Sequence, residues 1–142
     1  DFMSWVYTKK TDKQLRSWFS NKSNLDKVEI RFSDFNEFKN WYDQQTKVCF
    51  HCGLTEEESQ EIVYRGLLIS KRFPLGGKTK QGVNRCYWLE VDRKNPRGEY
   101  SSDKCVLICY FCNNDKSDVF DEEQYKEFLQ NRKGFMKKLL SK

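Results

Sequence analysis

Two Cys-x-x-Cys pairs constrain the fold of this chain more than any other feature of its sequence. The first pair is Cys49 and Cys52, and the second, far downstream, is Cys109 and Cys112. Four thiolates supplied by two such pairs form a closed tetrahedral site for Zn²⁺, which leaves no position open for water. The spacing therefore predicts one structural zinc ion that holds two distant segments of the chain together.

The remaining cysteines and the composition define the class of protein. Six cysteines in 142 residues would also suit a secreted disulfide framework. We favour the metal site because of the pair spacing and because the sequence shows no export signal. Cys86 and Cys105, outside the pairs, are expected to be reduced. The length predicts one domain, the aromatic fraction of 15% supplies its core, and no apolar run is long enough to span a membrane.

Basic residues gather in two stretches, although the formal net charge is only +5. One stretch covers residues 71–100, and the other is the last twelve residues of the chain. Such stretches suit the phosphate backbone of a nucleic acid, whereas the simpler interpretation is a set of solvated lysines. The residues that we expect to contact DNA are Lys78, Lys80, Arg85, Lys94, Arg97, Lys137 and Lys138.

Capping patterns and apolar periodicity predict the helices of the first half. Thr11 and Thr55 each open a capping box, and Ser33 is expected to cap a third helix. A short strand over residues 27–32 is predicted just before Ser33. Helical spacing on the third helix places an aromatic stripe toward the core, which we favour over a base-stacking surface. The stripe consists of Phe35, Phe38, Trp41 and Tyr42.

The second half has the pattern strand, loop, strand, helix. Residues 86–92 and 105–110 are rich in β-forming side chains, and the turn-forming residues Asn, Pro and Gly separate them over 94–100. We expect a helix to begin at Asn113 and a single final helix to follow the cap residue Asp121.

Two strands and a helix rooted in a zinc knuckle make up the ββα-metal arrangement, an α+β fold. Three strings of residues make the pattern specific. Leu-Glu-Val-Asp-Arg at 89–93 precedes Gly-Glu-Tyr-Ser at 98–101, and Cys-x-x-Cys-Asn-x-x-Lys-Ser follows at 109–117. Over residues 35–120 the chain resembles the zinc-bearing HNH endonucleases. It is most similar to a branch of restriction enzymes with Asp-Arg in place of the usual Asp-His.

The resemblance implies a catalytic site formed by residues on both sides of the second cysteine pair, which we call the second knuckle; the first pair forms the first knuckle. Asp92 and Asn113 would hold one Mg²⁺ or Mn²⁺, ions suited to hard oxygen ligands. Arg93 stands where the family has its general base, and a guanidinium cannot act as a base. The related branch suggests Tyr100 as the replacement. Arg93 and Lys116 would contact the scissile phosphate.

The identity of the base stays open at this point. His51, the only histidine, lies inside the first knuckle, where it is either a zinc ligand in place of a cysteine, a surface residue or the base. A phenol has a pKa near 10, so Tyr100 needs Arg93 and a bound cation to lower its pKa. The family's middle asparagine falls at Lys104, beside Asp103, so the resemblance does not give the geometry of that loop.

These observations predict a metal-dependent DNA endonuclease. We expect an extension at 1–33, the zinc-braced nuclease core at 34–120 and a basic C-terminal helix at 121–142. Cutting both strands of double-stranded DNA with one such site per chain requires two chains or two binding events, and a homodimer on a near-palindromic sequence is the simpler solution. The resemblance implies an intracellular bacterial or phage protein with a restriction, phage or mobile-element role. The alternative is a non-catalytic zinc module that binds nucleic acid, which the missing histidine favours.

Overall fold

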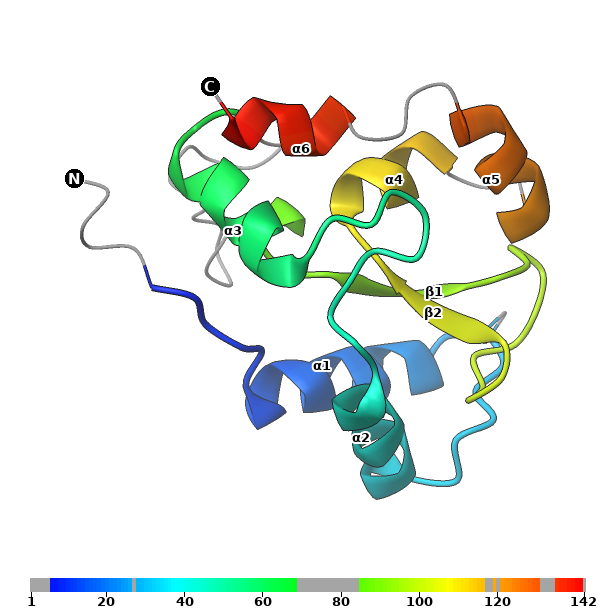
Figure 1. Ribbon diagram of the computed structural model, residues 1–142. Helices are drawn as coiled ribbons and strands as arrows, with labels where there is room; N and C mark the ends of the chain where they lie inside the picture. Colours follow the sequence, from blue (N-terminus) through cyan, green and yellow to red (C-terminus); the bar gives the residue numbers. More distant parts are fainter. Residues whose placement is uncertain are drawn as a thin grey trace.

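The structure, a computed structural model, describes residues 6–26, 28–68, 85–116, 119, 121–130 and 135–141. For Arg85, Phe128, Phe135, Met136 and Lys138 it gives the backbone alone. In these ranges the elements run in the order α1 (Asp12–Ser23), α2 (Phe35–Gln44), α3 (Glu56–Tyr64), a 3₁₀-helix (Arg85–Tyr87), β1 (Glu90–Arg93), β2 (Cys105–Ile108), α4 (Tyr110–Lys116), α5 (Glu122–Leu129) and α6 (Phe135–Leu140) (Figure 1).

The two strands form an antiparallel hairpin at the centre of the fold. Glu90 lies opposite Ile108, and Arg93 lies opposite Cys105. Every residue of β2 is buried. Helices α1 and α2 lie on one side of the hairpin, and α4, α5 and α6 lie on the other (Figure 1). The fold is therefore of the α+β class, with a small antiparallel sheet between helices, as predicted.

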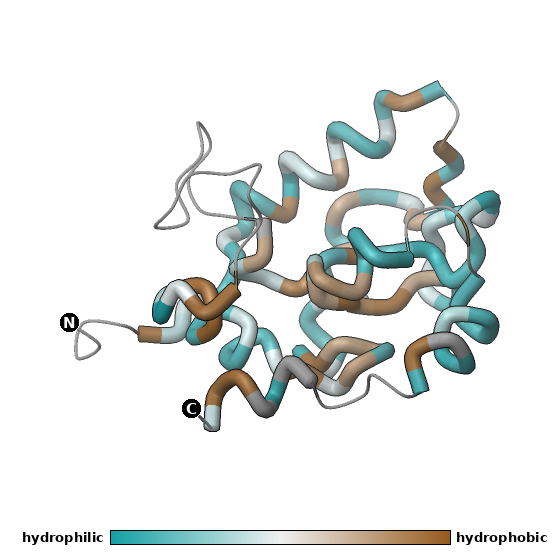
Figure 2. The backbone as a smooth tube through the Cα atoms, turned by 90° about the horizontal axis from the view of Figure 1, so that it is seen from above, coloured by the Kyte–Doolittle hydropathy of each residue, from teal (hydrophilic) through white to brown (hydrophobic). Residues whose placement is uncertain are grey.

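Aromatic side chains build the core between the hairpin, α1 and α2. Phe38 is fully buried, and its ring centroid lies 4.8 Å from that of Trp18 and 5.4 Å from that of Phe32. Trp41 is also buried and donates its indole N–H to the carbonyl of Ser102 (3.0 Å). Aromatic side chains bury more apolar area than any others, so this short stripe secures both helices. The apolar parts of the chain gather toward the middle of the molecule (Figure 2).

The starts of the first three helices agree with the sequence except at one cap. Thr11 and Thr55 form the predicted capping boxes of α1 and α3. The cap of α2 is Asp34, whose carboxylate accepts from the backbone N–H of Glu37 (2.9 Å). Ser33 was the predicted cap, but its hydroxyl donates to the Glu37 carboxylate (2.9 Å). Both residue types favour this position, so local chemistry alone did not separate them.

The strand predicted over 27–32 is wrong in extent, because the described part of that range, residues 28–32, forms only an isolated bridge. Ile30 pairs with Tyr100 in parallel. The Tyr100 N–H donates to the carbonyl of Glu29 (2.9 Å), and the Arg31 N–H donates to the carbonyl of Tyr100 (2.7 Å). The N-terminal segment thus fixes the backbone of Tyr100.

The strand predicted over 86–92 begins late, at Glu90. Residues Arg85–Tyr87 form a 3₁₀ turn instead. The backbone N–H of Leu89 donates to the carboxylate of Glu56 (3.0 Å), which is itself buried at the start of α3. A side chain from a distant helix therefore takes the place of a strand partner, and single-sequence periodicity does not reveal this.

The second strand ends early and its helix begins early. The strand predicted over 105–110 stops at Ile108, and α4 begins at Tyr110, inside the knuckle. Asn113, the predicted start of this helix, lies one turn into it, and its N–H donates to the carbonyl of Cys109 (3.0 Å). Of the second cysteine pair, Cys112 therefore lies in the first turn of α4, and Cys109 directly precedes the helix.

The single final helix predicted after Asp121 is two helices. Asp121 does cap α5, because its carboxylate accepts from the N–H of Gln124 (2.8 Å). That helix ends at Leu129, and α6 begins at Phe135 and packs against α3. Among the residues that the structure describes, no helix has the length and apolar character needed to cross a membrane.

Candidate metal centre and catalytic site

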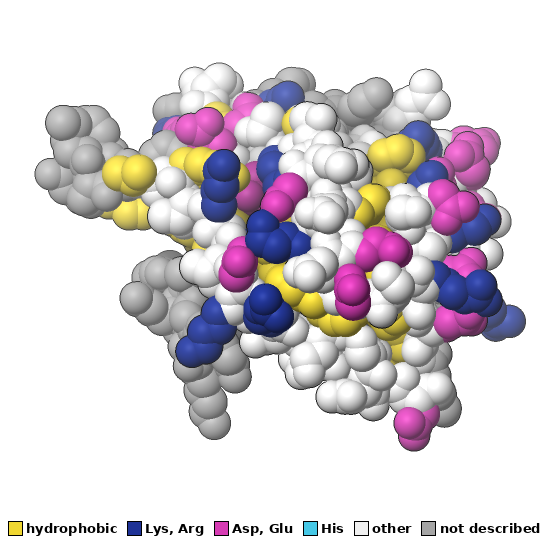
Figure 3. Space-filling view, turned by 90° about the horizontal axis from the view of Figure 1, so that it is seen from below, with side chains coloured by type: hydrophobic (Ala, Val, Ile, Leu, Met, Phe, Trp, Pro, Cys, Tyr) yellow, Lys and Arg dark blue, Asp and Glu magenta, His cyan; other side chains and the backbone are white. Residues whose placement is uncertain are grey.

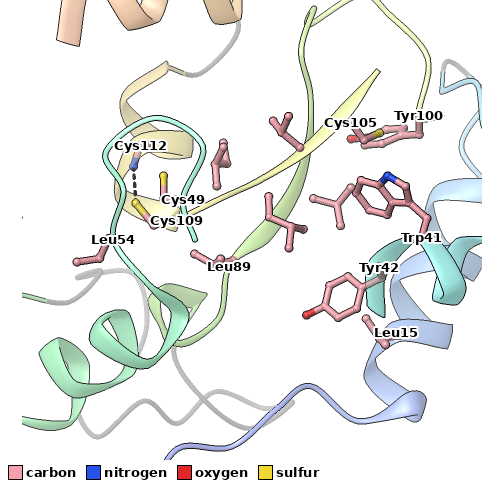
Figure 4. Packing of buried hydrophobic residues seen from close by; sticks show 14 of the residues in the cluster. Leu15, Trp41, Tyr42, Cys49, Leu54, Leu89, Tyr100, Cys105, Cys109 and Cys112 are labelled. Carbon is pink, nitrogen blue, oxygen red and sulfur yellow. Dashed lines mark hydrogen bonds between the residues drawn. The ribbon is translucent and has the colours of Figure 1, made fainter. Parts of the chain in front are cut away.

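The four paired cysteines form one cluster, and Figure 4 shows Cys49, Cys109 and Cys112 of this cluster at one end of the hairpin. Their sulfur atoms all lie within 4.8 Å of one another, and the Cys52 and Cys109 sulfurs are 3.7 Å apart. Tetrahedral ligands at about 2.3 Å from zinc would be separated by about 3.8 Å. The predicted ligand arrangement of Cys49, Cys52, Cys109 and Cys112 is confirmed, and Zn²⁺ suits it.

Backbone contacts attach the first knuckle to the hairpin. Gly53 adopts a positive φ of 77°, a conformation that favours glycine, and this turn lets the Cys49 N–H donate to the carbonyl of Leu54 (2.7 Å). The Phe50 N–H donates to the carbonyl of Leu107 in β2 (2.9 Å). The first cysteine pair therefore adds its backbone to the hairpin, and a metal ion held by the four sulfurs would also join it to α4.

His51 is neither a surface residue nor part of the sulfur cluster. Its side chain is only 6% exposed, and neither ring nitrogen has a hydrogen-bond partner among the described residues. The ring packs edge-on against Tyr125 of α5, with the centroids 4.7 Å apart. Burial lowers the pKa of His51. The surface interpretation is wrong, and the four sulfurs provide a complete set of ligands without the imidazole.

Two side-chain pairs join β1 to α4 next to the sulfur cluster. The Lys116 ammonium donates to Asp92 Oδ2 (2.7 Å) and to the carbonyl of Arg93 (3.0 Å). The Asn113 side-chain amide donates to Glu90 Oε1 (2.7 Å). Lys116 is 1% exposed, whereas the Asp92 side chain is 19% exposed. The structure thus brings three of the sequence-predicted site residues onto one strand–helix junction.

Arg93 and Tyr100 meet in the loop that follows β1. The Arg93 guanidinium lies 4.9 Å from the centre of the Tyr100 ring and donates to the carbonyl of Gly98 (3.0 Å). Tyr100 is 4% exposed, and its ring packs edge-on against Trp18 of α1, with the centroids 5.3 Å apart. The Lys22 ammonium lies 5.5 Å from the centre of the same ring. Both cations and α1 therefore surround the candidate base.

The surroundings of Tyr100 raise the pKa of its phenol. Burial raises this pKa, and the nearby charge of Arg93 lowers it without cancelling the effect of burial. Arg93 lies beside the ring as expected, but the pKa of Tyr100 in the chain by itself is raised and not lowered. Only a further positive charge can then bring the pKa toward neutrality.

The loop before β2 is held by side chains other than the family's asparagine. The Ser101 hydroxyl donates to Asp103 Oδ1 (2.9 Å), which lowers the pKa of that carboxyl. The Lys104 N–H donates to the carbonyl of Ser101 (3.2 Å). Asp103 therefore fixes a loop position that sequence comparison left undefined.

The predicted DNA contacts are only partly within the described residues. Arg97 is exposed in the loop between the strands, Lys94 is half-buried, and the Lys137 ammonium lies 3.8 Å from a carboxylate oxygen of Glu58. One face of the molecule carries basic and acidic side chains interspersed around a strip of apolar atoms (Figure 3). The residues outside the described set are Lys78 and Lys80, together with the side chains of Arg85 and Lys138.

Sequence reasoning missed Glu90 and the contribution of α1. Glu90 lies two residues before Asp92, and alternate residues of a strand project from the same face, so its place beside Asn113 follows from strand geometry. Nothing comparable in the sequence links Trp18 to Tyr100, because that contact depends on how α1 packs.

Comparison with known proteins agrees with this geometry. The structure matches that of PacI, a rare-cutting HNH restriction endonuclease that perturbs DNA. The TM-score is 0.64, and the two sequences are 19% identical. The match covers 91% of this chain and 81% of the PacI chain. Profiles of protein families gave no match, and neither did the curated proteins. The chain has an HNH-like fold, the fold predicted from its sequence.

Proposed function

We propose that this chain is a metal-dependent DNA endonuclease that hydrolyses phosphodiester bonds. The observation that carries the proposal is the junction of β1 and α4 on an HNH-like fold, where Lys116 pairs with Asp92 and Asn113 pairs with Glu90. A fold alone does not define an activity, so the argument rests on these side chains.

The oxygen atoms at this junction suit a divalent cation such as Mg²⁺ or Mn²⁺. Lys116 binds one carboxylate oxygen of Asp92, so the proposed ligand atom is the other, Oδ1. Asn113 donates its NH₂ group to Glu90, so its proposed ligand atom is the carbonyl oxygen. Few protein ligands, all hard oxygens, favour an ion that keeps several waters. Bound there, the ion would stabilise charge on the phosphoryl group and on the leaving oxygen.

Arg93 and Lys116 were both expected to contact the phosphate, and we propose a different role for each. The Arg93 guanidinium is half-buried beside Tyr100, and we propose that it makes the charge-assisted contact to the scissile phosphate. Lys116 is enclosed and directed at Asp92 and the Arg93 carbonyl. We assign it to orienting Asp92 and not to contact with DNA, which changes its expected role.

Tyr100 is the proposed base in place of the family's histidine. Its phenolate oxygen would take a proton from water while the water oxygen attacks phosphorus and the bond to the 3′ oxygen breaks. The backbone of Tyr100 is fixed by Glu29 and Arg31, and its ring is held against Trp18. This rigidity suits a group that must meet a water molecule at a set distance.

The proposed substrate is double-stranded DNA, cut by a homodimer. The likeness to a restriction endonuclease supports DNA as the substrate. A two-fold dimer would place one site on each strand. We propose the exposed Arg97, together with the other predicted basic residues, as contacts to the phosphate backbone and an intracellular role in restriction or in a phage or mobile element.

Plasmid cleavage tests the proposal directly. Zinc-loaded protein is incubated with supercoiled plasmid in Mg²⁺, in Mn²⁺ and in EDTA, with Asp92→Asn as the matched inactive variant. The expected result is cleavage that requires the divalent ion and is lost in the variant. Equal cleavage by Asp92→Asn would point to a contaminating nuclease and would refute the assignment of the site.

One observation favours the second candidate, a zinc module that binds DNA without cutting it. The only histidine is enclosed, and burial raises the pKa of the tyrosine that would replace it. This candidate predicts retention of DNA in a gel-shift assay without cleavage in either Mg²⁺ or Mn²⁺.

A further inference from the structure

We propose that Glu90 is a positioning residue that selects the orientation of the Asn113 amide, an inference that rests on the proposed function. The Asn113 Nδ2 atom lies 2.7 Å from Glu90 Oε1. Glu90 belongs to β1, and Asn113 belongs to α4, so the contact crosses the strand–helix junction. Glu90 lies inside the Leu-Glu-Val-Asp-Arg string, but it is not among the proposed metal ligands or catalytic residues.

The chemistry of the pair explains the selection. An asparagine side chain presents an NH₂ donor on one side and a carbonyl acceptor on the other, and only the carbonyl oxygen can bind a cation. An ionised carboxylate is an acceptor only, so it can pair with the NH₂ group and not with the carbonyl. Glu90 thereby holds the Asn113 carbonyl on the side away from itself, where the cation is proposed to bind.

The position of Glu90 follows from two periodicities. Glu90 and Asp92 are two residues apart on β1, so they share a face. Asn113 and Lys116 are three residues apart on α4, so they also share a face. Two parallel pairs result, Asn113 with Glu90 and Lys116 with Asp92. In each pair a residue that is not a proposed ligand orients one that is: Glu90 orients Asn113, and Lys116 orients Asp92.

Two substitutions of Glu90 test the inference in the zinc-loaded full chain. Glu90→Ala removes the acceptor, so kcat for plasmid cleavage is expected to fall about 10- to 100-fold, the usual cost of losing a partner that orients a metal ligand. KM for DNA should stay unchanged, because Glu90 is not proposed to touch the substrate. Glu90→Gln keeps an acceptor but adds a donor, so it should retain more activity than Glu90→Ala. Glu127→Ala, an exposed carboxylate on α5, is the control.

Two measurements without DNA separate positioning from a general structural role. Mn²⁺ binding to the protein alone, followed by electron paramagnetic resonance, should weaken by about 10- to 100-fold in Glu90→Ala and much less in Glu90→Gln. In the wild-type chain, one Asn113 side-chain amide proton should resonate downfield because of its bond to a carboxylate. This shift should persist in saturating Mg²⁺ and disappear in both variants.

Three results would overturn the inference. Unchanged Mn²⁺ affinity in Glu90→Ala would show that Glu90 orients nothing. Loss of the downfield amide proton on adding Mg²⁺ would make Glu90 a direct ligand. Equal defects in Glu90→Gln and Glu90→Ala would also indicate that Glu90 is a direct ligand. If the wild-type protein cuts no DNA, the proposed endonuclease function fails, while the Mn²⁺ and amide measurements still decide the role of Glu90.

Discussion

Short helix α4 contributes to both the sulfur cluster and the polar junction, the place where Asn113 and Lys116 of α4 meet Glu90 and Asp92 of β1, yet the two sites differ in chemistry. Cys109 and Cys112 flank the start of α4, where their sulfurs join a buried cluster that satisfies all four tetrahedral positions. Asn113 and Lys116 follow at once, and their partners are oxygens of β1. One site is complete within the protein, whereas the other offers oxygen atoms to a ligand from outside.

The difference shows how a small domain separates stability from chemistry. A closed thiolate site contributes binding free energy to folding and fixes where α4 begins. The rigid helix then carries Asn113 and Lys116 to β1 at set positions. The oxygen atoms of Asp92 and Asn113 do not have to anchor the helix, so their orientation can serve the proposed reaction.

Loss of a zinc ligand should have the largest effect. Cys109→Ala is expected to abolish zinc binding and to unfold the chain, because structural zinc supplies about 10–16 kcal/mol in small domains, as much as the whole stability of a typical domain. Metal analysis and circular dichroism measure both outcomes.

A buried cysteine outside the cluster provides the matched control for that experiment. Cys86→Ala removes a sulfur that is just as buried, so it should keep one zinc per chain and lose only about 1–2 kcal/mol of stability. A folded, zinc-containing Cys109→Ala chain would contradict the contrast between a closed site and an open one.

Removal of the oxygen ligands should leave the fold intact and stop the reaction. Asp92→Asn keeps an acceptor for Lys116, and Asn113→Ala removes only the amide. Each is expected to lower kcat at least about 10³-fold by weakening transition-state stabilisation, with DNA affinity nearly unchanged. Single-turnover cleavage and fluorescence anisotropy measure the two quantities. Normal cleavage by both variants would place the active site elsewhere.

Disruption of the buried ion pair should cost stability as well as activity. Lys116→Met keeps the side-chain length and leaves Asp92 without its partner, so we expect a loss of about 3 kcal/mol in the free energy of unfolding. The Asp92 side chain is partly exposed, which places the loss at the low end of the range for buried pairs. A double-mutant cycle with Asp92→Asn isolates the pair, and a coupling near zero would show that Lys116 merely fills space.

The sequence predicts these two sites unequally, and geometry explains why. The spacing of two Cys-x-x-Cys pairs is by itself typical of a tetrahedral metal site, so all four members of the sulfur cluster were predicted. The strand–loop–strand–helix order was predicted too, although β1 and β2 are shorter than periodicity suggested. The Leu89 N–H donates to Glu56, and the ring of Tyr100 packs against Trp18. Contacts between segments so far apart leave no local signal in the sequence, so the packing around the proposed base could not be predicted, apart from the nearby Arg93.

Tyr100→Phe tests whether the junction contains a base. The change removes only the phenolic oxygen, so packing against Trp18 remains, and the rate should fall at least about 10²-fold. Burial raises the pKa of Tyr100, and the active form is the phenolate. The wild-type rate should therefore rise about tenfold for each pH unit from neutrality up to the phenol's pKa in the metal-loaded enzyme. A rate that is flat above pH 7, with full activity in the variant, would exclude the tyrosine.

The smallest expected effect compares two basic residues that differ in their partners. Arg97 is exposed in the loop next to the polar junction, whereas the Lys137 ammonium lies 3.8 Å from a Glu58 oxygen on the α3–α6 side. Each phosphate contact contributes about 0.9 to the slope of log K against log salt for duplex DNA. Arg97→Ala should reduce that slope by about one, with a several-fold loss of affinity. Lys137→Ala should reduce the slope less, because the lysine already has a carboxylate nearby.

A salt titration of both variants distinguishes the outcomes. Equal reductions in the slope would mean that DNA contacts both sides of the molecule, and no reduction in either variant would assign both residues to solubility alone.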